Sequence, residues 1–320
     1  MKDVSIIIVN YNTKEFLEKA VYSIIENTLD ISYEIILIDN ASLDGSFDFT
    51  QKLQDKDEFK IIKLDKNVGF AKANNIAATY AEGKYILLLN PDTLLFENTI
   101  KKVLDFRVSL SKPAIIGIKL LNPDGSFQPC RSQFPKIYNF LVQAFFLNSI
   151  FKKSKYFDRV NYGWQDPEVI SYVDSVKGAF LFVDTPIWKE LKGFDEDYFV
   201  YTEEVDFCFR AKKKGIDVIY YPETAIIHFG GESMDLNRLE TYIEMQKTIL
   251  LFLKKNRGKI YSSIFRFVLA LSAFNRILLN FLLQFFKKPK SYFDNKWRLY
   301  LYTFIWFISG YRKNVKIKLK

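Results

Sequence analysis

Histidine and cysteine are scarce in this chain, and their scarcity excludes several classes of protein. The 320 residues contain one histidine, His228, and two cysteines, Cys130 and Cys208. Two isolated cysteines and one histidine do not provide the ligands of a structural zinc site, and they indicate no disulfide framework. A reducing compartment is therefore expected. No G-x-S-x-G motif occurs, so a Ser-His-Asp arrangement would have to form around the single histidine.

Long uncharged segments and phosphate-binding glycine motifs are also missing. The longest uncharged stretch, Ile137–Phe151, has 15 residues, whereas a membrane-spanning helix needs about 20. Met1 leads directly into a strand-like run, so we expect no signal peptide. Neither G-x-G-x-x-G after the first strand nor G-x-x-x-x-G-K-[ST] is present, which disfavours a dinucleotide-binding domain and excludes a P-loop protein.

Positive charge is present in excess, but it is concentrated at one end of the chain. The formal net charge is +9. Residues 240–320 carry 17 Lys and Arg against 3 Asp and Glu, a net charge of +14, and the rest of the chain has a net charge of −5. The basic excess therefore belongs to the C-terminal quarter and does not indicate an anionic partner for the whole protein.

The first hundred residues alternate apolar runs with helical patterns. Strands are predicted at Val4–Val9, Glu34–Ile38, Lys60–Leu64 and Tyr85–Leu89, because each is a short and nearly continuous apolar run. Amphipathic helical segments separate them. This alternation predicts an α/β fold with a Rossmann-like, mostly parallel sheet flanked by helices.

Short polar side chains follow each of these four strands. Asn10 follows the first strand, Asp39 the second, Asn67 the third and Asn90 the fourth. Such residues are common in ordinary turns, but ligands of parallel sheets bind beyond the carboxyl ends of the strands. Four successive polar ends therefore predict a site suited to a nucleotide base, a ribose and a metal-bound diphosphate.

The order and spacing of these motifs identify a family. The chain resembles the inverting family 2 glycosyltransferases with the type A nucleotide-diphospho-sugar fold, and within them the rhamnosyltransferase-like branch. The matching segments are VSIIIVNYN (Val4–Asn12), IDNASLDGS (Ile38–Ser46), NVGFAKANN (Asn67–Asn75), LLNPDT (Leu88–Thr93), KGAFLFV (Lys177–Val183), GFDEDYFVYTEEVDFCFR (Gly193–Arg210) and HFGG (His228–Gly231).

The resemblance implies donor-binding roles at the ends of the first three strands. Asp39 would accept a hydrogen bond from the imide N–H of a uracil or thymine ring, beside Asn10. Asn67 and the turn at Gly69 would let the backbone approach the nucleotide, with Lys72 nearby. The alternatives are a turn or helix cap for Asp39 and a plain turn for Gly69.

The resemblance also implies a divalent metal site. Asn90-Pro91-Asp92 stands where the family has its Asp-x-Asp signature, with Asn90 in place of the first acid. Asp92 would bind Mn²⁺ or Mg²⁺ bridging the two phosphates, and His228 would be a second ligand at the end of an apolar strand. Mn²⁺ accepts this mixture of oxygen and imidazole ligands better than Mg²⁺ does. The alternative for a lone histidine is a structural role.

Catalysis would depend on a carboxylate at the start of a helix. By position in the motif, Glu204 is the general base that takes the proton from the acceptor hydroxyl, although Glu203-Glu204 replaces the family's usual Glu-Asp pair. Lys177 and Gly178 would line the sugar pocket, and Arg131 or Glu203 would contact the phosphates or the acceptor. The alternative is that these acids only stabilise a helix N-terminus.

The C-terminal segment combines basic, aromatic and apolar residues. Ile260–Phe286 fits one amphipathic helix, and a second apolar segment covers Trp297–Ile308. Arg266 and Arg276 argue against a spanning helix, so residues 260–320 are expected to lie on a membrane surface, where anionic lipid attracts Lys287, Lys288 and Lys290. The alternative is a helical hairpin packed on the catalytic domain or on a second subunit, and a homo-oligomer stays open. No basic groove indicates nucleic acid.

Together these features predict a glycosyltransferase domain at 1–237 and a basic helical region at 238–320. Residues 1–112 would bind the nucleotide of dTDP-rhamnose or a UDP-sugar, and residues 113–237 would bind a glycan or polyprenyl-linked acceptor in surface polysaccharide synthesis. The expected location is the cytoplasmic face of the cell membrane. Two alternatives remain at this point: a sugar nucleotidyltransferase, disfavoured because no Gly or Arg follows the first strand, and a catalytically silent membrane-peripheral scaffold.

Overall fold

The computed structural model divides into two units. The first unit comprises Met1–Phe134 and Gln165–Asn237, and the second comprises Pro135–Trp164 and Arg238–Lys320. The predicted boundary near residue 237 separates the two, but residues 135–164, which we included in the domain 1–237, belong to the second unit. The structure describes residues 2–54, 56–151, 154–157, 160–230, 238–286 and 296–309.

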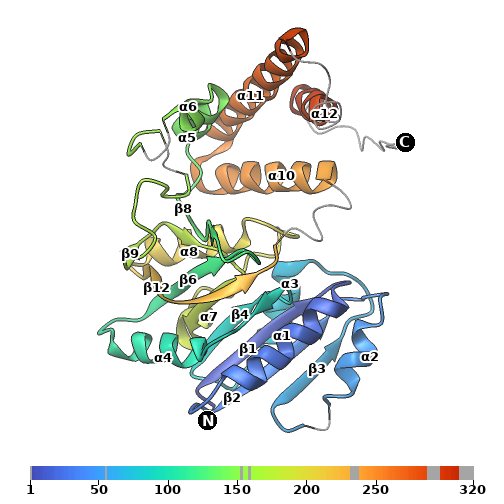
Figure 1. Ribbon diagram of the computed structural model, residues 1–320, viewed down its shortest axis with the longest axis vertical. Helices are drawn as coiled ribbons and strands as arrows, with labels where there is room; N and C mark the ends of the chain where they lie inside the picture. The colour runs from blue at the N-terminus through green and yellow to red at the C-terminus, as the bar shows by residue number, and fades with distance from the viewer. Residues whose placement is uncertain are drawn as a thin grey trace. The chain divides into compact units, whose positions relative to one another are not determined.

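A mixed, mostly parallel sheet forms the core of the first unit (Figure 1). Its strand order is β3-β2-β1-β4-β11-β6-β12-β5, with β7 beside β6 and β9 beside β12, while β8 and β10 form a separate pair. Every residue of β1 is buried, as expected for a strand covered on both faces. The strands are β1 Val4–Asn10, β2 Tyr33–Asp39, β3 Phe59–Lys63, β4 Tyr85–Leu89, β5 Thr93–Leu94, β6 Ala114–Leu121, β7 Phe127–Gln128, β8 Arg131–Ser132, β9 Ser171–Tyr172, β10 Ser175–Val176, β11 Phe180–Asp184 and β12 Asp217–His228.

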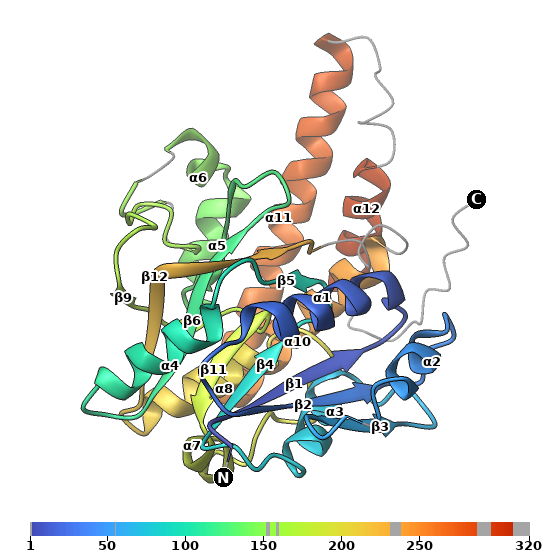
Figure 2. The same ribbon diagram turned by 60° about the horizontal axis from the view of Figure 1, so that its bottom comes forward.

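Helices cover both faces of this sheet. Figure 2 shows α1 on one face and α3 on the other. The β1-to-β2 and β3-to-β4 connections run across the sheet in opposite directions, so right-handed crossovers place their helices on opposite faces. The helices of the first unit are α1 Lys14–Asn27, α2 Ser46–Gln51, α3 Phe70–Ala78, α4 Thr99–Ser109, α7 Thr185–Glu190 and α8 Glu203–Lys213.

The strands predicted in the first hundred residues are confirmed, and further strands follow residue 112. β6 lies inside the sheet between β11 and β12, although its sequence stands in a stretch where we predicted no strand. β10 and β11 are separated by Lys177–Ala179. The long strand β12 has a register shift against β6 between Tyr221 and Ala225.

One antiparallel strand brings distant segments to the same edge of the sheet. β11 runs antiparallel to β4, with Phe180 opposite Leu89, so the residues before β11 lie beside the carboxyl end of β4. β12 is parallel to β6, which is itself antiparallel to β11. The carboxyl end of β12 therefore reaches this edge too, and His228 stands opposite Thr93 of β5.

The second unit is helical. The predicted helix over Ile260–Phe286 is confirmed as α11, and Phe265 of this helix packs against Phe140 of α5 with ring centroids 4.4 Å apart. Phe274 of α11 lies near Phe304 of α12 at 6.0 Å. The predicted lysine cluster at 287–290 and the basic end at 311–320 lie outside the described residues. The helices are α5 Ile137–Ala144, α6 Leu147–Ile150, α10 Arg238–Arg257, α11 Lys259–Phe286 and α12 Lys296–Ile308.

Candidate functional site

The ends of β1 and β2 are joined by their polar side chains. Asn10 and Asp39 stand opposite each other in the parallel register, and the Asn10 Nδ2 donates to Asp39 Oδ1 at 3.0 Å and to Ser42 Oγ at 2.9 Å. The backbone N–H of Ser42 donates to Asp39 Oδ2 at 3.1 Å. The structure thus brings Asn10 and Asp39 together, and each carboxylate oxygen keeps a second lone pair for a further donor.

A second set of hydrogen bonds fastens the loop after β3. The Asn40 Nδ2 donates to Asn67 Oδ1 at 2.9 Å, and the same oxygen accepts from the Gly69 N–H at 2.9 Å. Gly69 has φ +87°, and an added Cβ would lie 2.5 Å from the carbonyl oxygen of Phe199. The turn therefore requires glycine for both its conformation and its close approach to Phe199.

The ends of β4 and β12 bring together the predicted metal residues. His228 Nε2 lies 3.3 Å from Asp92 Oδ1 and 3.4 Å from the Asn90 Nδ2. Both side chains of the first pair are largely buried, with 12% of His228 and 16% of Asp92 exposed. The Thr93 hydroxyl donates to the Asn90 carbonyl at 2.8 Å and holds the turn between them. Residues separated by more than 130 positions thus face each other.

Gln128, which the sequence analysis did not select, orients the imidazole of His228. His228 Nδ1 lies 2.6 Å from Gln128 Oε1, while the Gln128 Nε2 donates to Asn122 Oδ1 at 2.9 Å and to the His228 carbonyl at 3.1 Å. Since both amide hydrogens have acceptors, Oε1 must accept, and the imidazole carries its proton on Nδ1. A neutral His228 then presents the Nε2 lone pair toward Asp92.

This arrangement fits a divalent cation that is also bound by substrate. Metal-binding histidines usually donate their second N–H to an acceptor that fixes the tautomer, as Gln128 does here. Among the residues that the structure describes, no three Asp, Glu, His or Cys gather into one group. Asp92 and His228 could therefore supply two ligands, and water and phosphate oxygens would fill the remaining positions of such an ion.

The predicted sugar-binding segment adjoins the predicted metal residues. The Asn90 N–H donates to the carbonyl of Ala179 at 3.1 Å, which fixes the neighbouring Gly178 at the same edge of the sheet. A Cβ added at Gly178 would lie 3.9 Å from the Glu204 Cβ and 3.8 Å from the Phe70 ring. Gly178 thus lies next to Glu204, and the segment Lys177–Ala179 connects the metal candidates with the candidate base.

A strained turn positions the two glutamates. Tyr201 and Thr202 both have left-handed φ angles, +70° and +74°, and such angles are unusual for a β-branched residue. Each costs on the order of 1–3 kcal/mol, and strain of this kind is often found at functional sites. The turn leads into the first residues of α8, Glu203 and Glu204, and it brings them to the Gly178 segment.

Both glutamates have raised pKa values because Glu203 is buried and Glu204 is partly buried. Glu203 is 4% exposed, and among the described residues its Oε2 and that of Glu204 have no hydrogen-bond partner. Burial raises the pKa of Glu203 well above its usual range, and the charge of Glu204 raises it further. Burial also raises the pKa of Glu204, an effect that backbone hydrogen bonds and the nearby Lys177 ammonium oppose. This pair can therefore hold a proton at a pH where an exposed glutamate would not.

We expect Glu203→Gln to stabilise the protein at neutral pH. Between the ordinary pKa near 4.5 and the raised value, the folded state holds a proton that the unfolded chain releases, so stability falls as the pH rises through this interval. Glutamine removes that loss and should raise the melting temperature by roughly 2–4 °C for each 1 kcal/mol recovered. Thermal melts across pH, with the exposed Glu190→Gln as control, measure it. Parallel curves for wild type and Glu203→Gln would contradict the expectation.

Arg131 does not belong to this site, contrary to one prediction. Its side chain is 2% exposed, and its guanidinium donates to Ser171 Oγ at 2.8 Å and to the carbonyls of Gln165 and Asp166 at 3.3 and 3.2 Å. The guanidinium also lies over the ring of Tyr220 at 4.4 Å. The guanidinium therefore holds the segment before β9 in place. Arg131 is not a phosphate or acceptor contact.

The two predicted lysines lie on the surface. Lys72, on the exposed face of α3, forms an ion pair with Glu196 at 3.2 Å. Lys177 is exposed and influences Glu204, as described above. Lys177 therefore remains a candidate beside the sugar-binding segment, whereas Lys72 is engaged with the loop before Phe199.

Comparison with known proteins identifies relatives of this chain. Residues 5–157 match the family Glycosyl transferase family 2. The rhamnosyltransferase WbbL of Escherichia coli is 28% identical over 239 residues, which cover 71% of this chain and 83% of that protein. N-acetylglucosaminyl-diphospho-decaprenol L-rhamnosyltransferase of Mycobacterium tuberculosis is 23% identical over 259 residues, covering 78% of this chain and 83% of that protein.

A solved structure shows the same fold. The mannosyltransferase PcManGT from Pyrobaculum calidifontis, solved in complex with GDP-Man and Mn²⁺, superposes with a TM-score of 0.56 at 14% identity, covering 97% of this chain and 89% of that chain. At this identity the likeness concerns the fold alone, and it agrees with the mostly parallel sheet described above. The sequence and structural matches together support the resemblance found in the motifs: the chain carries a glycosyltransferase family 2 domain, matched over residues 5–157, and has the type A fold.

Proposed function

We propose that this protein transfers a sugar, with inversion, from a nucleotide-diphospho-sugar to a hydroxyl of a glycan or lipid-linked glycan. The donor is dTDP-rhamnose or a UDP-sugar, and the product is a surface polysaccharide or its precursor. Residues 1–112 bind the nucleotide. Residues of 113–237 that belong to the first unit bind the sugar and bring the acceptor to it.

The observation that carries this proposal is that the candidate metal ligands and the candidate base are connected through the segment before β11. Asp92 and His228 lie 3.3 Å apart, and the adjacent Asn90 is hydrogen-bonded to Ala179. Gly178, which comes just before Ala179, lies next to Glu204. A diphosphate near Asp92 would thus leave its sugar near Gly178, within reach of a carboxylate that can accept a proton.

The reaction is a single displacement. The Glu204 carboxylate accepts the proton of the acceptor hydroxyl as the acceptor oxygen bonds to the anomeric carbon of the sugar. The bond between that carbon and the diphosphate oxygen breaks on the opposite face, so the nucleoside diphosphate leaves with the bonding electrons. A raised pKa brings Glu204 closer to the operating pH, which favours general-base catalysis.

Asp92 and His228 would hold Mn²⁺ or Mg²⁺ in this reaction. When bound, the ion supplies positive charge that stabilises the leaving diphosphate. The mixed carboxylate and imidazole ligands favour Mn²⁺, and the Mn²⁺ complex of the mannosyltransferase with the same fold supports this choice. Because Asn90 stands in place of an acid, the motif Asn90-Pro91-Asp92 offers the ion one carboxylate.

Nucleotide contacts are proposed for the ends of β1 to β3. The Asp39 carboxylate, held by Asn10 and Ser42, has the acceptor capacity to bind the imide N–H of a pyrimidine base. Asn67 and Gly69 would shape the loop beside it. The two rhamnosyltransferases among the relatives favour dTDP-rhamnose as the donor.

Membrane attachment through the second unit would give access to a lipid-linked acceptor. The Mycobacterium relative is named for an N-acetylglucosaminyl-diphospho-decaprenol substrate. By length and composition the segment Lys259–Leu282 could also cross a membrane, with a mean hydropathy of 1.5. We favour peripheral association at the cytoplasmic face, because Arg266 and Arg276 are costly within a bilayer.

The test is a donor screen with the full-length protein. Purified protein is incubated with Mn²⁺ and a panel of dTDP-, UDP- and GDP-sugars, and release of nucleoside diphosphate is measured with and without a polyprenyl-diphosphate glycan acceptor. We expect release with dTDP-rhamnose or a UDP-sugar, increased by the acceptor. No turnover with any donor and acceptor would favour a scaffold, and pyrophosphate release from a nucleoside triphosphate would indicate a nucleotidyltransferase.

A further inference from the structure

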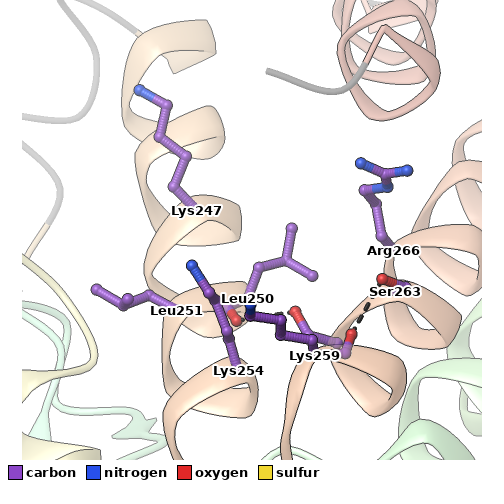
Figure 3. Close-up of a pocket in the computed structure, with 8 residues that line it drawn as sticks. Lys247, Leu250, Leu251, Lys254, Lys259, Ser263 and Arg266 are labelled. Carbon is purple, nitrogen blue, oxygen red and sulfur yellow. Dashed lines mark hydrogen bonds between the residues drawn. The ribbon is translucent and has the colours of Figure 1, made fainter. Parts of the chain in front are cut away.

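A basic pocket lies between α10 and α11, entirely within the second unit. Its volume is about 430 Å³, within the range of small-molecule sites. Figure 3 shows Lys247, Leu251 and Lys254 on one helix, and Ser263 and Arg266 on the other. The lining residues are Lys247, Leu250, Leu251, Lys254, Lys259, Ser262, Ser263 and Arg266.

The two helices contribute matching stripes to this pocket. In α10 the residues from Lys247 to Lys254 follow the pattern K-x-x-L-L-x-x-K, and in α11 those from Lys259 to Arg266 follow K-x-x-S-S-x-x-R. Positions i, i+3, i+4 and i+7 share one face of a helix. Each stripe therefore has a cation at either end and small or apolar residues in the middle.

The junction between the helices holds these stripes in place. Gly258, with φ +92°, separates α10 from α11. The Ser262 Oγ donates to the carbonyl of Leu250 at 3.0 Å and ties the two helices together. The Ser263 Oγ donates to the carbonyl of Lys259 at 3.0 Å. The pocket is thus built by local packing within one helical hairpin.

The charge of the pocket is not balanced by its own lining. None of the lining residues is acidic. Lys247 forms an ion pair with Glu244 at 3.0 Å, but within the described ranges no ion pair is found for Lys254, Lys259 or Arg266. Three cations that share one small pocket repel each other, and an anion with several oxygens would relieve this repulsion.

An exposed apolar stripe adjoins the pocket on α11. Ile260, Ile264, Phe267, Phe274 and Leu278 are 80%, 49%, 71%, 48% and 46% exposed. Their spacings of three, four and seven residues place them on one face of the helix. At about 100° per residue, this face lies roughly a third of a turn from the face that lines the pocket. A phosphate in the pocket would therefore lie beside an apolar surface.

We propose that the pocket between α10 and α11 binds the phosphate of an anionic membrane lipid while the apolar stripe of α11 enters the bilayer. Cationic side chains beside an exposed apolar helix face are typical of interfacial helices. A soluble phosphate would satisfy the cations but would leave the stripe in water. The proposal rests on the membrane association proposed above, and it assigns that association to a defined site.

The test compares two triple variants of the full-length chain. Lys254→Gln, Lys259→Gln and Arg266→Gln together neutralise the pocket. Lys155→Gln, Lys255→Gln and Arg257→Gln remove the same charge from the second unit outside it. Sedimentation is measured with phosphatidylcholine vesicles with and without phosphatidylglycerol. We expect the partition coefficient of the pocket variant on anionic vesicles to be about a hundredfold lower than that of the wild type. The decrease in the control should be about tenfold or less. Equal losses would show diffuse attraction and overturn the proposal.

A second arm separates lipid from free phosphate. Inorganic phosphate and diphosphate are titrated into the wild type, the pocket variant and Phe267→Ser, whose parent side chain is exposed. We expect Phe267→Ser to weaken vesicle binding and leave anion binding unchanged. Phosphate binding without sedimentation on anionic vesicles would overturn the lipid assignment. Nucleoside diphosphate release by the same variants reports separately on the proposed transferase function, because none of these residues belongs to that site.

Discussion

Glu204→Gln is expected to lower the rate of sugar transfer by about 10²–10⁴-fold, the usual contribution of a general base. Glutamine has nearly the same shape but cannot accept a proton from the acceptor hydroxyl. The Glu204 side chain lies next to Gly178, and its Oε2 has no hydrogen-bond partner among the described residues, so the substitution should not weaken the fold. Transfer to the acceptor is measured at saturating donor, together with a thermal melt.

Two further variants sharpen this test. Glu204→Asp keeps a carboxylate but shortens the side chain by one methylene, so it should retain more activity than Glu204→Gln. Glu190→Gln removes a half-exposed carboxylate that pairs with Lys214 at 2.6 Å, and it should leave the rate unchanged. In wild type the rate should fall as the pH is lowered through the raised pKa of Glu204. Unchanged turnover in Glu204→Gln would remove this residue as the base.

Asp92→Ala is expected to reduce the affinity for Mn²⁺ by more than about 100-fold, beyond the loss caused by a residue that only orients a ligand. Among the residues that the structure describes, Asp92 is the carboxylate found beside His228 Nε2, so alanine leaves the imidazole as the one strong ligand in that part of the chain. Metal binding is measured by titration followed by electron paramagnetic resonance of free Mn²⁺, without donor. The transfer rate should fall in parallel.

Replacing Gln128, which orients His228, should weaken Mn²⁺ binding less than replacing Asp92. Gln128→Leu removes the acceptor of the His228 Nδ1 proton and should weaken Mn²⁺ binding by about 10–100-fold. Asp105→Ala is the matched control, since Asp105 is 61% exposed and pairs only with Lys101 in the described part of the chain. Wild-type Mn²⁺ affinity in Asp92→Ala would show that the ion binds elsewhere.

Local sequence patterns predicted the parallel half of the fold well. β1 to β4 are short apolar runs followed by polar residues, and their periodicity is visible without tertiary contacts. β6 was missed because Ala114–Leu121 stands among aromatic and proline-rich segments, and its strand character depends on burial between β11 and β12. The same limitation hid Gln128, which lies beside His228 only through the pairing of β6 with β7 and β12. The hairpin signal of Asn122–Gly125 could have placed Gln128 opposite Leu120.

Arg131, by contrast, was predicted to belong to the site and does not. Its residue type suggested an anion contact, and nothing in the local sequence indicated that Ser171, Gln165 and Asp166 would occupy its guanidinium. These partners lie 34 to 40 positions away. Whether a buried arginine serves substrate or structure depends on which segments fold around it.

The amino-acid sequence by itself determined the family, the strand ends that carry polar residues, the amphipathic character of α11 and the concentration of positive charge in the last quarter. These are local properties of composition, spacing and periodicity. Only the tertiary structure decided that Asp92 meets His228, that Gln128 sets the imidazole tautomer, and that Glu204 borders Gly178. It also brought the two cationic stripes of α10 and α11 to one pocket. Each of these pairings depends on the register of strands or on the packing of helices, which long-range contacts set and local sequence does not.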